Sequence, residues 1–212
     1  MIRGYALVLG LGVIAAALFA GWYGTTRVVY FPPALFEQSV QCDAGWGGPQ
    51  PVIDDFEADW YGEALRGFDE PSLYRASLTP EAAARSLRFT WLRSFHDPIV
   101  VRIERSADGS VRLTAGQNAR GRREGSLTRR LTRNLTSDEV RELDAVLTRA
   151  ALPDQPPKLC ERGADGARWI IEAVEPSTGY TYVNRWTPRD GPVREVGLHV
   201  LGLTGWRIAD VY

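Results

Sequence analysis

The chain begins with an uncharged, mostly apolar run at residues 4–26, with Arg3 before it and Arg27 after it. As a helix, this run is long enough to cross the roughly 30 Å hydrocarbon core of a bilayer. Trp22 and Tyr23 near its end are typical of a membrane–water interface. The pattern therefore predicts a transmembrane helix. A cleaved signal sequence is the alternative, although the apolar stretch exceeds the usual length of about 7–15 residues and no clean small-residue cleavage site follows it.

Apolar and polar residues alternate in four successive stretches between about residues 86 and 135. Period-two alternation is typical of strands that bury one face, and Asp108-Gly109 is a strong hairpin signal. The pattern predicts four consecutive antiparallel strands. Their apolar residues are Phe89, Trp91 and Phe95, then Ile99, Val101 and Ile103, then Val111, Leu113 and Ala115, and finally Leu127, Leu131 and Leu135.

Helical spacing occurs on both sides of this strand region. Residues 52–67 suit a helix, with Phe56, Trp60 and Ala64 on one face at four-residue spacing. Further helices are expected from Thr136 and from Pro192, with a short helical turn from Thr79 to Ala84 and two more strands around Trp169 and Tyr182.

These elements predict an α+β fold, with a mainly antiparallel sheet of about six strands and helices packed on one side. The expected organisation is a transmembrane or signal segment at 4–26, a tether at 27–51 and a single globular domain at 52–212.

The composition indicates where the protein is located, but it says little about the activity. The basic residues are almost all arginine, which is typical of a GC-rich bacterial genome, and the net charge of −1 gives no general case for nucleic-acid binding. With the apolar run, this favours a single-pass protein of the bacterial inner membrane whose C-terminal domain lies in the periplasm. Secretion to the periplasm after signal cleavage is the alternative.

Charge is unevenly distributed along the domain. Acidic residues dominate 43–84, and arginines dominate 85–133. Two interpretations stay open. The two segments pack together and neutralise each other, or the basic segment faces an anionic partner such as an envelope protein or anionic lipid.

Cys42 and Cys160 are the two cysteines of the chain. An even pair in an oxidising compartment favours a structural disulfide, with two free buried thiols as the alternative. With two histidines and no CxxC motif, neither a metal site nor a redox centre is expected, and no cofactor is implied.

Several stretches look familiar together: Leu87 to His96, Asp97 to Arg102, Asp165 to Glu172, and Tyr182 to Pro188, followed by the last helix. Over roughly residues 85–205 they resemble a group of uncharacterised bacterial envelope proteins. The group has no assigned activity. The resemblance implies a single domain and transfers no catalytic residue.

His96 is the candidate catalytic residue, because it lies at a turn between two expected strands and beside Asp97. A histidine beside a carboxylate can act as a general base, and Ser94 and Thr90 are the nearby hydroxyls. Neighbouring residues on a strand point to opposite faces, so His96 and Asp97 need not meet. The alternative is a structural turn residue.

The densest basic cluster supplies the candidate binding residues Arg122, Arg123, Arg129 and Arg130. They suit an anionic partner, although arginines on an edge strand also protect it from edge-to-edge association. The expected function is a membrane-tethered, periplasm-facing, non-catalytic domain that binds a protein or envelope component. The alternatives are a small hydrolase or transferase with His96 as general base, and an immunity-like or inhibitory module.

Overall fold

A computed structural model describes residues 28–43, 45, 47–79, 85–118, 127–161 and 163–212. The expected transmembrane segment at 4–26, and residues 80–84 of the expected helical turn, lie outside these ranges. Among the described residues, no helix combines the length and the apolar character needed to cross a membrane.

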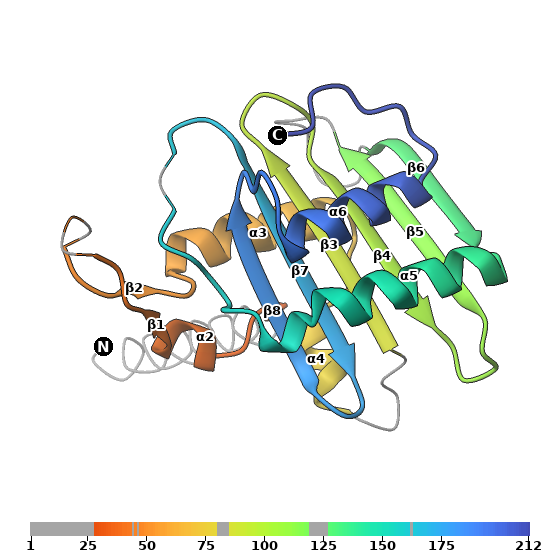
Figure 1. Cartoon of the computed structure of the whole chain (residues 1–212), viewed down its shortest axis with the longest axis horizontal. Helices are drawn as coiled ribbons and strands as arrows, with labels where there is room; N and C mark the ends of the chain where they lie inside the picture. The colour runs from red at the N-terminus through yellow and green to blue at the C-terminus, as the bar shows by residue number, and fades with distance from the viewer. Residues whose placement is uncertain (1–27, 44, 46, 80–84, 119–126, 162) are drawn as a thin grey trace, which may run out of the picture.

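Six antiparallel strands form the central sheet in the order β6-β5-β4-β3-β7-β8 (Figure 1). The strands are β3 (Arg85–Arg93), β4 (Ile99–Arg105), β5 (Val111–Asn118), β6 (Leu127–Asn134), β7 (Ala167–Glu175) and β8 (Gly179–Trp186). The four consecutive strands expected from the alternation are β3 to β6, and the two later ones are β7 and β8. The predicted α+β class with a six-stranded antiparallel sheet is thus confirmed.

The first face of the sheet is covered by α5 (Ser137–Ala150) and α6 (Pro192–Leu203). Phe89, Trp91 and Trp169 lie in this core and are fully buried. Gly197 lets α6 approach closely, because a Cβ atom at this position would lie 2.5 Å from the Trp169 ring. The larger of the two apolar cores therefore lies between this face and the pair of helices.

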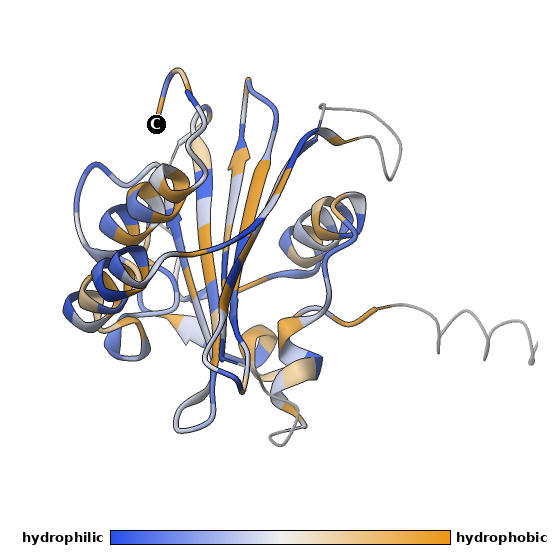
Figure 2. Cartoon of the chain, turned by 90° about the vertical axis from the view of Figure 1, so that its right-hand side faces the viewer, coloured by the Kyte–Doolittle hydropathy of each residue, from blue (hydrophilic) through white to orange (hydrophobic). Residues whose placement is uncertain are grey.

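Helices cover both faces of the sheet, which corrects the expectation that they pack on one side (Figure 2). The second face is covered by α2 (Ala34–Glu37), α3 (Asp55–Gly67) and α4 (Leu73–Ser77). Its core includes Leu92, Val100 and Ile170. The alternation of apolar and polar residues did not predict this core, because Arg88 and Thr90 lie on the same face and look like solvent-facing residues. Both are buried.

Helix α3 turns a different side to the sheet from the one that its apolar spacing predicts. Tyr61 is buried, whereas Phe56 is 75% exposed. Glu57 takes an inner position because Lys158 and Arg168 lie 2.9 and 3.0 Å from its carboxylate. The expected inner side was wrong because a hydrophobic pattern cannot show that a paired carboxylate is buried.

The expected tether at 27–51 is packed onto the second face of the sheet over its described residues. Tyr30 and Phe31 are buried there. The segment also contains the short strands β1 (Ser39–Val40) and β2 (Gln50–Pro51), which pair with each other. A disulfide joins Cys42 to Cys160 with 5.7 Å between their Cα atoms, which confirms the expected bond. The segment packs because its aromatic rings complete the second core.

Candidate functional site

A hollow of about 310 Å³ lies at one end of the sheet, where the β3–β4 turn meets the ends of β5 and β6. The chain that follows α6 lines another side of it. The polar residues of its lining include Arg93, His96, Gln117, Arg129 and Arg207. The hollow therefore brings together two residues that the sequence singles out separately, His96 and Arg129.

Arg129 lies on the first face of the sheet, as Leu131 does two residues later, and a β-bulge separates it from Leu127. The pairing of β5 with β6 shifts by one residue, which leaves Thr128 as the extra residue of β6. Leu127 consequently packs against the second core, whereas the Arg129 guanidinium lies 5.1 Å from the centre of the Trp206 ring beside the first core. A bulge of this kind re-aims a side chain at the edge of a sheet.

Arg93 holds the β3–β4 turn in place. Its guanidinium lies over the Trp91 ring, 4.4 Å from the ring centre, and its Nε donates a hydrogen bond of 3.0 Å to the Asp97 carbonyl oxygen. Burial lowers the pKa of Arg93. An arginine nevertheless stays cationic at neutral pH. Arg93 therefore contributes a positive charge whose position is fixed.

His96 is held by the chain that follows α6. Its Nδ1 lies 2.9 Å from the Tyr212 hydroxyl, and its Nε2 lies 3.6 Å from the Asp210 carboxylate. The main-chain oxygen of Tyr212 in turn accepts hydrogen bonds from the indole N–H groups of Trp91 and Trp169, at 3.3 and 2.9 Å. Because both indoles belong to the first core, His96 is positioned through a chain of contacts that starts there.

Positive charge dominates the hollow. Arg129 and Arg207 are both exposed, and neither has a carboxylate partner among the described residues. Asp97 is the only carboxylate among the described residues of the lining. Guanidinium groups match the geometry of carboxylates and phosphates and bind them through two parallel hydrogen bonds. The charge and the donors therefore suit an anionic group.

A larger depression of about 580 Å³ lies beside β8 and has a different character. Its lining contains Arg185 and Arg189 together with Glu161 and Asp190. Burial raises the pKa of Glu161, whose carboxylate accepts a hydrogen bond of 2.6 Å from the Trp186 main-chain N–H. Two acidic and two basic residues balance there, so this depression does not show the excess of positive charge found at His96.

The remaining sequence candidates do not join the hollow. Arg130 is exposed on β6, but it does not line the hollow, because its neighbour Arg129 points to the opposite face of the strand. Arg122 and Arg123 lie outside the described residues. Arg129 is therefore the one candidate arginine that lines the hollow in the part of the chain that the structure describes.

Arg133, a further arginine of β6, stabilises the start of α5. Its guanidinium lies 2.6 Å from the Glu139 carboxylate. This bond, with the hydrogen bond from the Thr136 main-chain N–H, lowers the pKa of Glu139 to about 2. Thr136 and Glu139 also form the capping box of the helix. Arg133 therefore has a structural role.

The uneven charge along the chain is partly neutralised within the fold. Glu70, from the acidic segment, lies 3.5 Å from Arg88 and 2.9 Å from Arg102 of the basic segment. Arg129 and Arg207, in contrast, point into the hollow without such partners among the described residues. Internal neutralisation is therefore shown for Arg88 and Arg102, whereas an anionic partner for the remaining arginines stays a prediction.

Sequence reasoning missed Arg93, Gln117 and Arg207. Arg93 follows Trp91 by two residues on the same strand, so the alternation already placed both on one face. Arg207 carries no such signal, because it follows the last helix in a stretch without periodicity. Its place in the hollow follows only from the tertiary structure, in which the chain after α6 lies beside β3.

The surroundings of His96 differ from those of a nucleophilic centre. The hydroxyl nearest to the ring is that of Tyr212, whereas the Ser94 hydroxyl accepts a hydrogen bond of 3.1 Å from the Gly166 main-chain N–H. No group of three or more histidines, cysteines and carboxylates is placed to hold a metal ion in the part of the chain that the structure describes. The arrangement is better suited to holding an anion than to activating a nucleophile.

Comparison with models of known protein families gives no match for this chain, and comparison with curated proteins gives no significant similarity. Its function has to be inferred from the chemistry of the site itself.

Proposed function

We propose that this protein is a membrane-tethered, non-catalytic domain that faces the periplasm and binds an acidic group of an envelope protein in the hollow at His96. The convergence of Arg93, Arg129 and Arg207 on one hollow is the observation that carries the proposal. The ligand chemistry is a carboxylate or a comparable anion, presented by a protein surface.

The proposed location rests on the sequence and on the disulfide. The apolar run at 4–26 supplies a single-pass anchor in the bacterial inner membrane, and release into the periplasm after cleavage is the alternative. The bond between Cys42 and Cys160 suits an oxidising compartment. The resemblance of residues 85–205 to uncharacterised bacterial envelope proteins agrees with this location.

Preorganisation supports binding at this site. Arg93 is fixed by Trp91 and the turn, and His96 is fixed by Tyr212, so these groups lose little freedom when a ligand arrives. Arg129 and Arg207 supply exposed guanidinium groups. A protein carboxylate that enters the hollow would meet several hydrogen-bond donors at once. It would not have to break an ion pair between either of these two arginines and another described residue.

Crosslinking of the intact protein in living cells, followed by mass spectrometry of the captured material, tests this proposal. The wild-type chain should give one reproducible partner. The double variant Arg129→Ala/Arg207→Ala should capture that partner at least about tenfold less, because each lost charge-assisted hydrogen bond costs about 1.5–3 kcal/mol.

Arg130→Ala is the matched control, because Arg130 is an exposed arginine on the same strand that does not line the hollow. It should capture the partner as well as the wild type does. Equal capture by all three chains, or no capture by a folded and membrane-associated wild type, would rule out the hollow as the binding site.

A further inference from the structure

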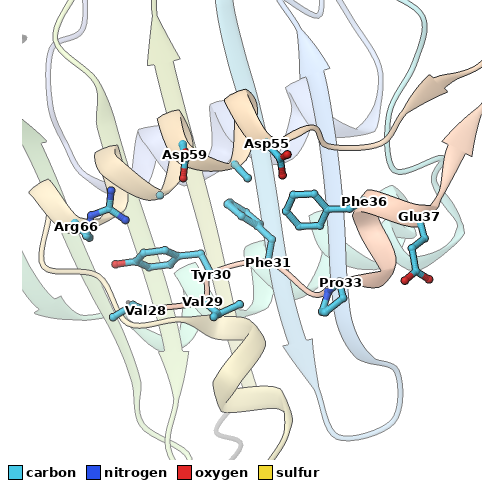
Figure 3. Close-up of a pocket in the computed structure, with 12 residues that line it drawn as sticks. Val28, Val29, Tyr30, Phe31, Pro33, Phe36, Glu37, Asp55, Asp59 and Arg66 are labelled. Carbon is cyan, nitrogen blue, oxygen red and sulfur yellow. The ribbon is translucent and has the colours of Figure 1, made fainter. Parts of the chain in front are cut away.

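A second, apolar groove lies between α3 and the segment that precedes it (Figure 3). It has a volume of about 490 Å³, and its apolar lining includes Val28, Val29, Phe31 and Phe36. The Phe31 and Phe36 side chains both line the groove beneath α3. Val28, Val29 and Phe36 keep between 37% and 43% of their surface exposed. The groove is therefore an accessible apolar surface.

The position of this groove along the chain indicates what covers it. Val28 follows the apolar run at 4–26 almost directly, and Tyr23 marks the expected interface of that run. Five residues of fully extended chain span at most about 17 Å. If the run crosses a bilayer, Val28 lies within that distance of the membrane interface.

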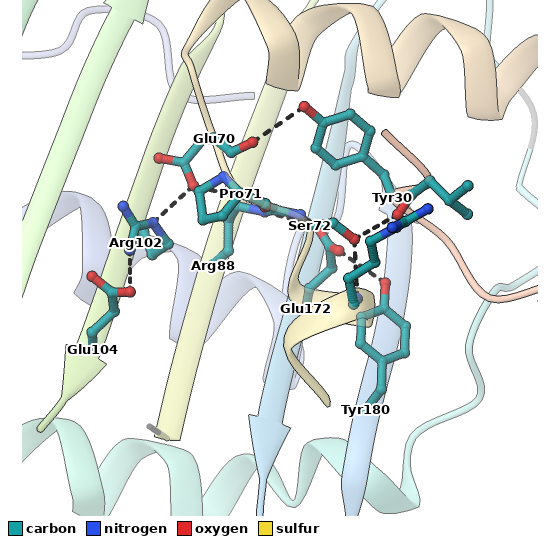
Figure 4. A network of polar contacts seen from close by, with 11 residues as sticks. Tyr30, Glu70, Pro71, Ser72, Arg88, Arg102, Glu104, Glu172 and Tyr180 are labelled. Atoms are coloured by element: carbon teal, nitrogen blue, oxygen red, sulfur yellow. Dashed lines mark hydrogen bonds and ion pairs between the residues drawn. The ribbon is translucent and has the colours of Figure 1, made fainter. Parts of the chain in front are cut away.

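The attachment of this segment to the sheet is firm (Figure 4). The Ser72 hydroxyl donates a hydrogen bond of 2.6 Å to the Val29 carbonyl oxygen, and the Tyr30 hydroxyl donates one of 3.1 Å to the Glu70 carbonyl oxygen. The Glu70 carboxylate lies 3.5 Å from Arg88, which is fully buried in the sheet. The groove is therefore fixed to the sheet from Val29 onward.

We propose that this groove takes the acyl chain of a zwitterionic lipid from the membrane that holds the protein. The proposal rests on the membrane tether proposed above. A groove lined by aliphatic and aromatic side chains next to a bilayer is covered most favourably by hydrocarbon, since exposed apolar surface is costly in water.

The charges at the groove select the class of lipid. Among the described residues of its lining, Glu37, Asp55 and Asp59 stand beside Arg66, so the carboxylates there outnumber the basic group. An anionic headgroup would be repelled by this excess, whereas a zwitterionic headgroup would not be.

The test uses the full chain with benzoylphenylalanine in place of Phe36, reconstituted into vesicles of equal parts phosphatidylethanolamine and phosphatidylglycerol. Irradiation should give lipid adducts, mainly with phosphatidylethanolamine. Leu198 is the matched control position, because it is 40% exposed, compared with 37% for Phe36, and lies on α6 at the other face of the sheet. The lipid adduct at position 36 should be at least fivefold more abundant than at position 198.

Flotation of the vesicles separates the two proposals. If the chain does not float with the vesicles, the proposed tether is wrong, and this inference is wrong with it. The groove proposal is wrong, and the tether remains supported, if the chain floats with one of three results. These results are no lipid adduct at position 36, equal adducts at position 198, or crosslinking to protein instead. Benzoylphenylalanine in place of Val28 repeats the test if the Phe36 variant does not fold.

Discussion

Arg88 is fully buried, although a charged side chain is rarely buried without partners. Its guanidinium lies 2.6 Å from the Glu172 carboxylate, which also accepts a hydrogen bond of 2.8 Å from the Tyr180 hydroxyl. The alternation of β3 correctly placed Arg88 on the face opposite Phe89. It could not show that this face is covered, because the covering segment contacts it from a distant part of the chain.

Replacement of Arg88 by alanine should lower the free energy of unfolding by about 3–5 kcal/mol, because it leaves Glu172 buried without its cation. Arg85→Ala is the control on the same strand, since its ion pair with Glu175 is exposed and should contribute about 0–1 kcal/mol. Urea unfolding of the full chain in mild detergent measures both. Similar losses in the two variants would contradict a structural role for the buried pair.

At the site, sequence reasoning singled out residues that carry a local signal, and their predicted roles stay predictions. His96 stood out because it lies in a turn, and Arg129 because it belongs to a dense basic cluster, and the hollow contains both. The bulge at Thr128, which puts Leu127 on the face opposite Arg129, has no signature in the sequence. Arg207 was missed because only the tertiary fold brings it next to the β3–β4 turn.

At the scale of elements, the strands and the two long C-terminal helices could be predicted because their apolar residues recur with a regular period. The two helices also begin at residues typical of helix starts. Thr136 is the N-cap of α5, and Pro192 is the first residue of α6. Helix α4 was not predicted, because five residues are too few to show a period. The inner side of α3 was assigned wrongly because Glu57 is buried through its ion pairs.

Helix α6 offers a test of the first core. Gly197→Ala should lower the free energy of unfolding by about 1–2 kcal/mol, because the gain in helix propensity is outweighed by contact with Trp169. Gly202→Ala should instead raise it by up to about 1 kcal/mol, since no atom lies within 4 Å of the added Cβ. Thermal unfolding of both variants measures the difference. A stabilised Gly197→Ala variant would show that α6 does not pack as closely as described.

At the scale of the molecule, the hollow and the groove lie on opposite faces of the sheet. The hollow adjoins the first core through Trp91 and Trp206, whereas the groove adjoins the second core through Tyr30 and Phe31. If the groove rests on the membrane, the hollow is turned away from it. This arrangement favours an envelope protein over a bilayer lipid as the anionic partner.

The most direct test places benzoylphenylalanine at Phe95, a residue of the hollow that is 65% exposed, in the full chain in living cells. Irradiation should join this position to one protein partner, and the adduct should be lost when Arg129→Ala/Arg207→Ala is added. No adduct, or the same adduct with and without the two arginines, would contradict the proposal that the hollow binds an acidic group.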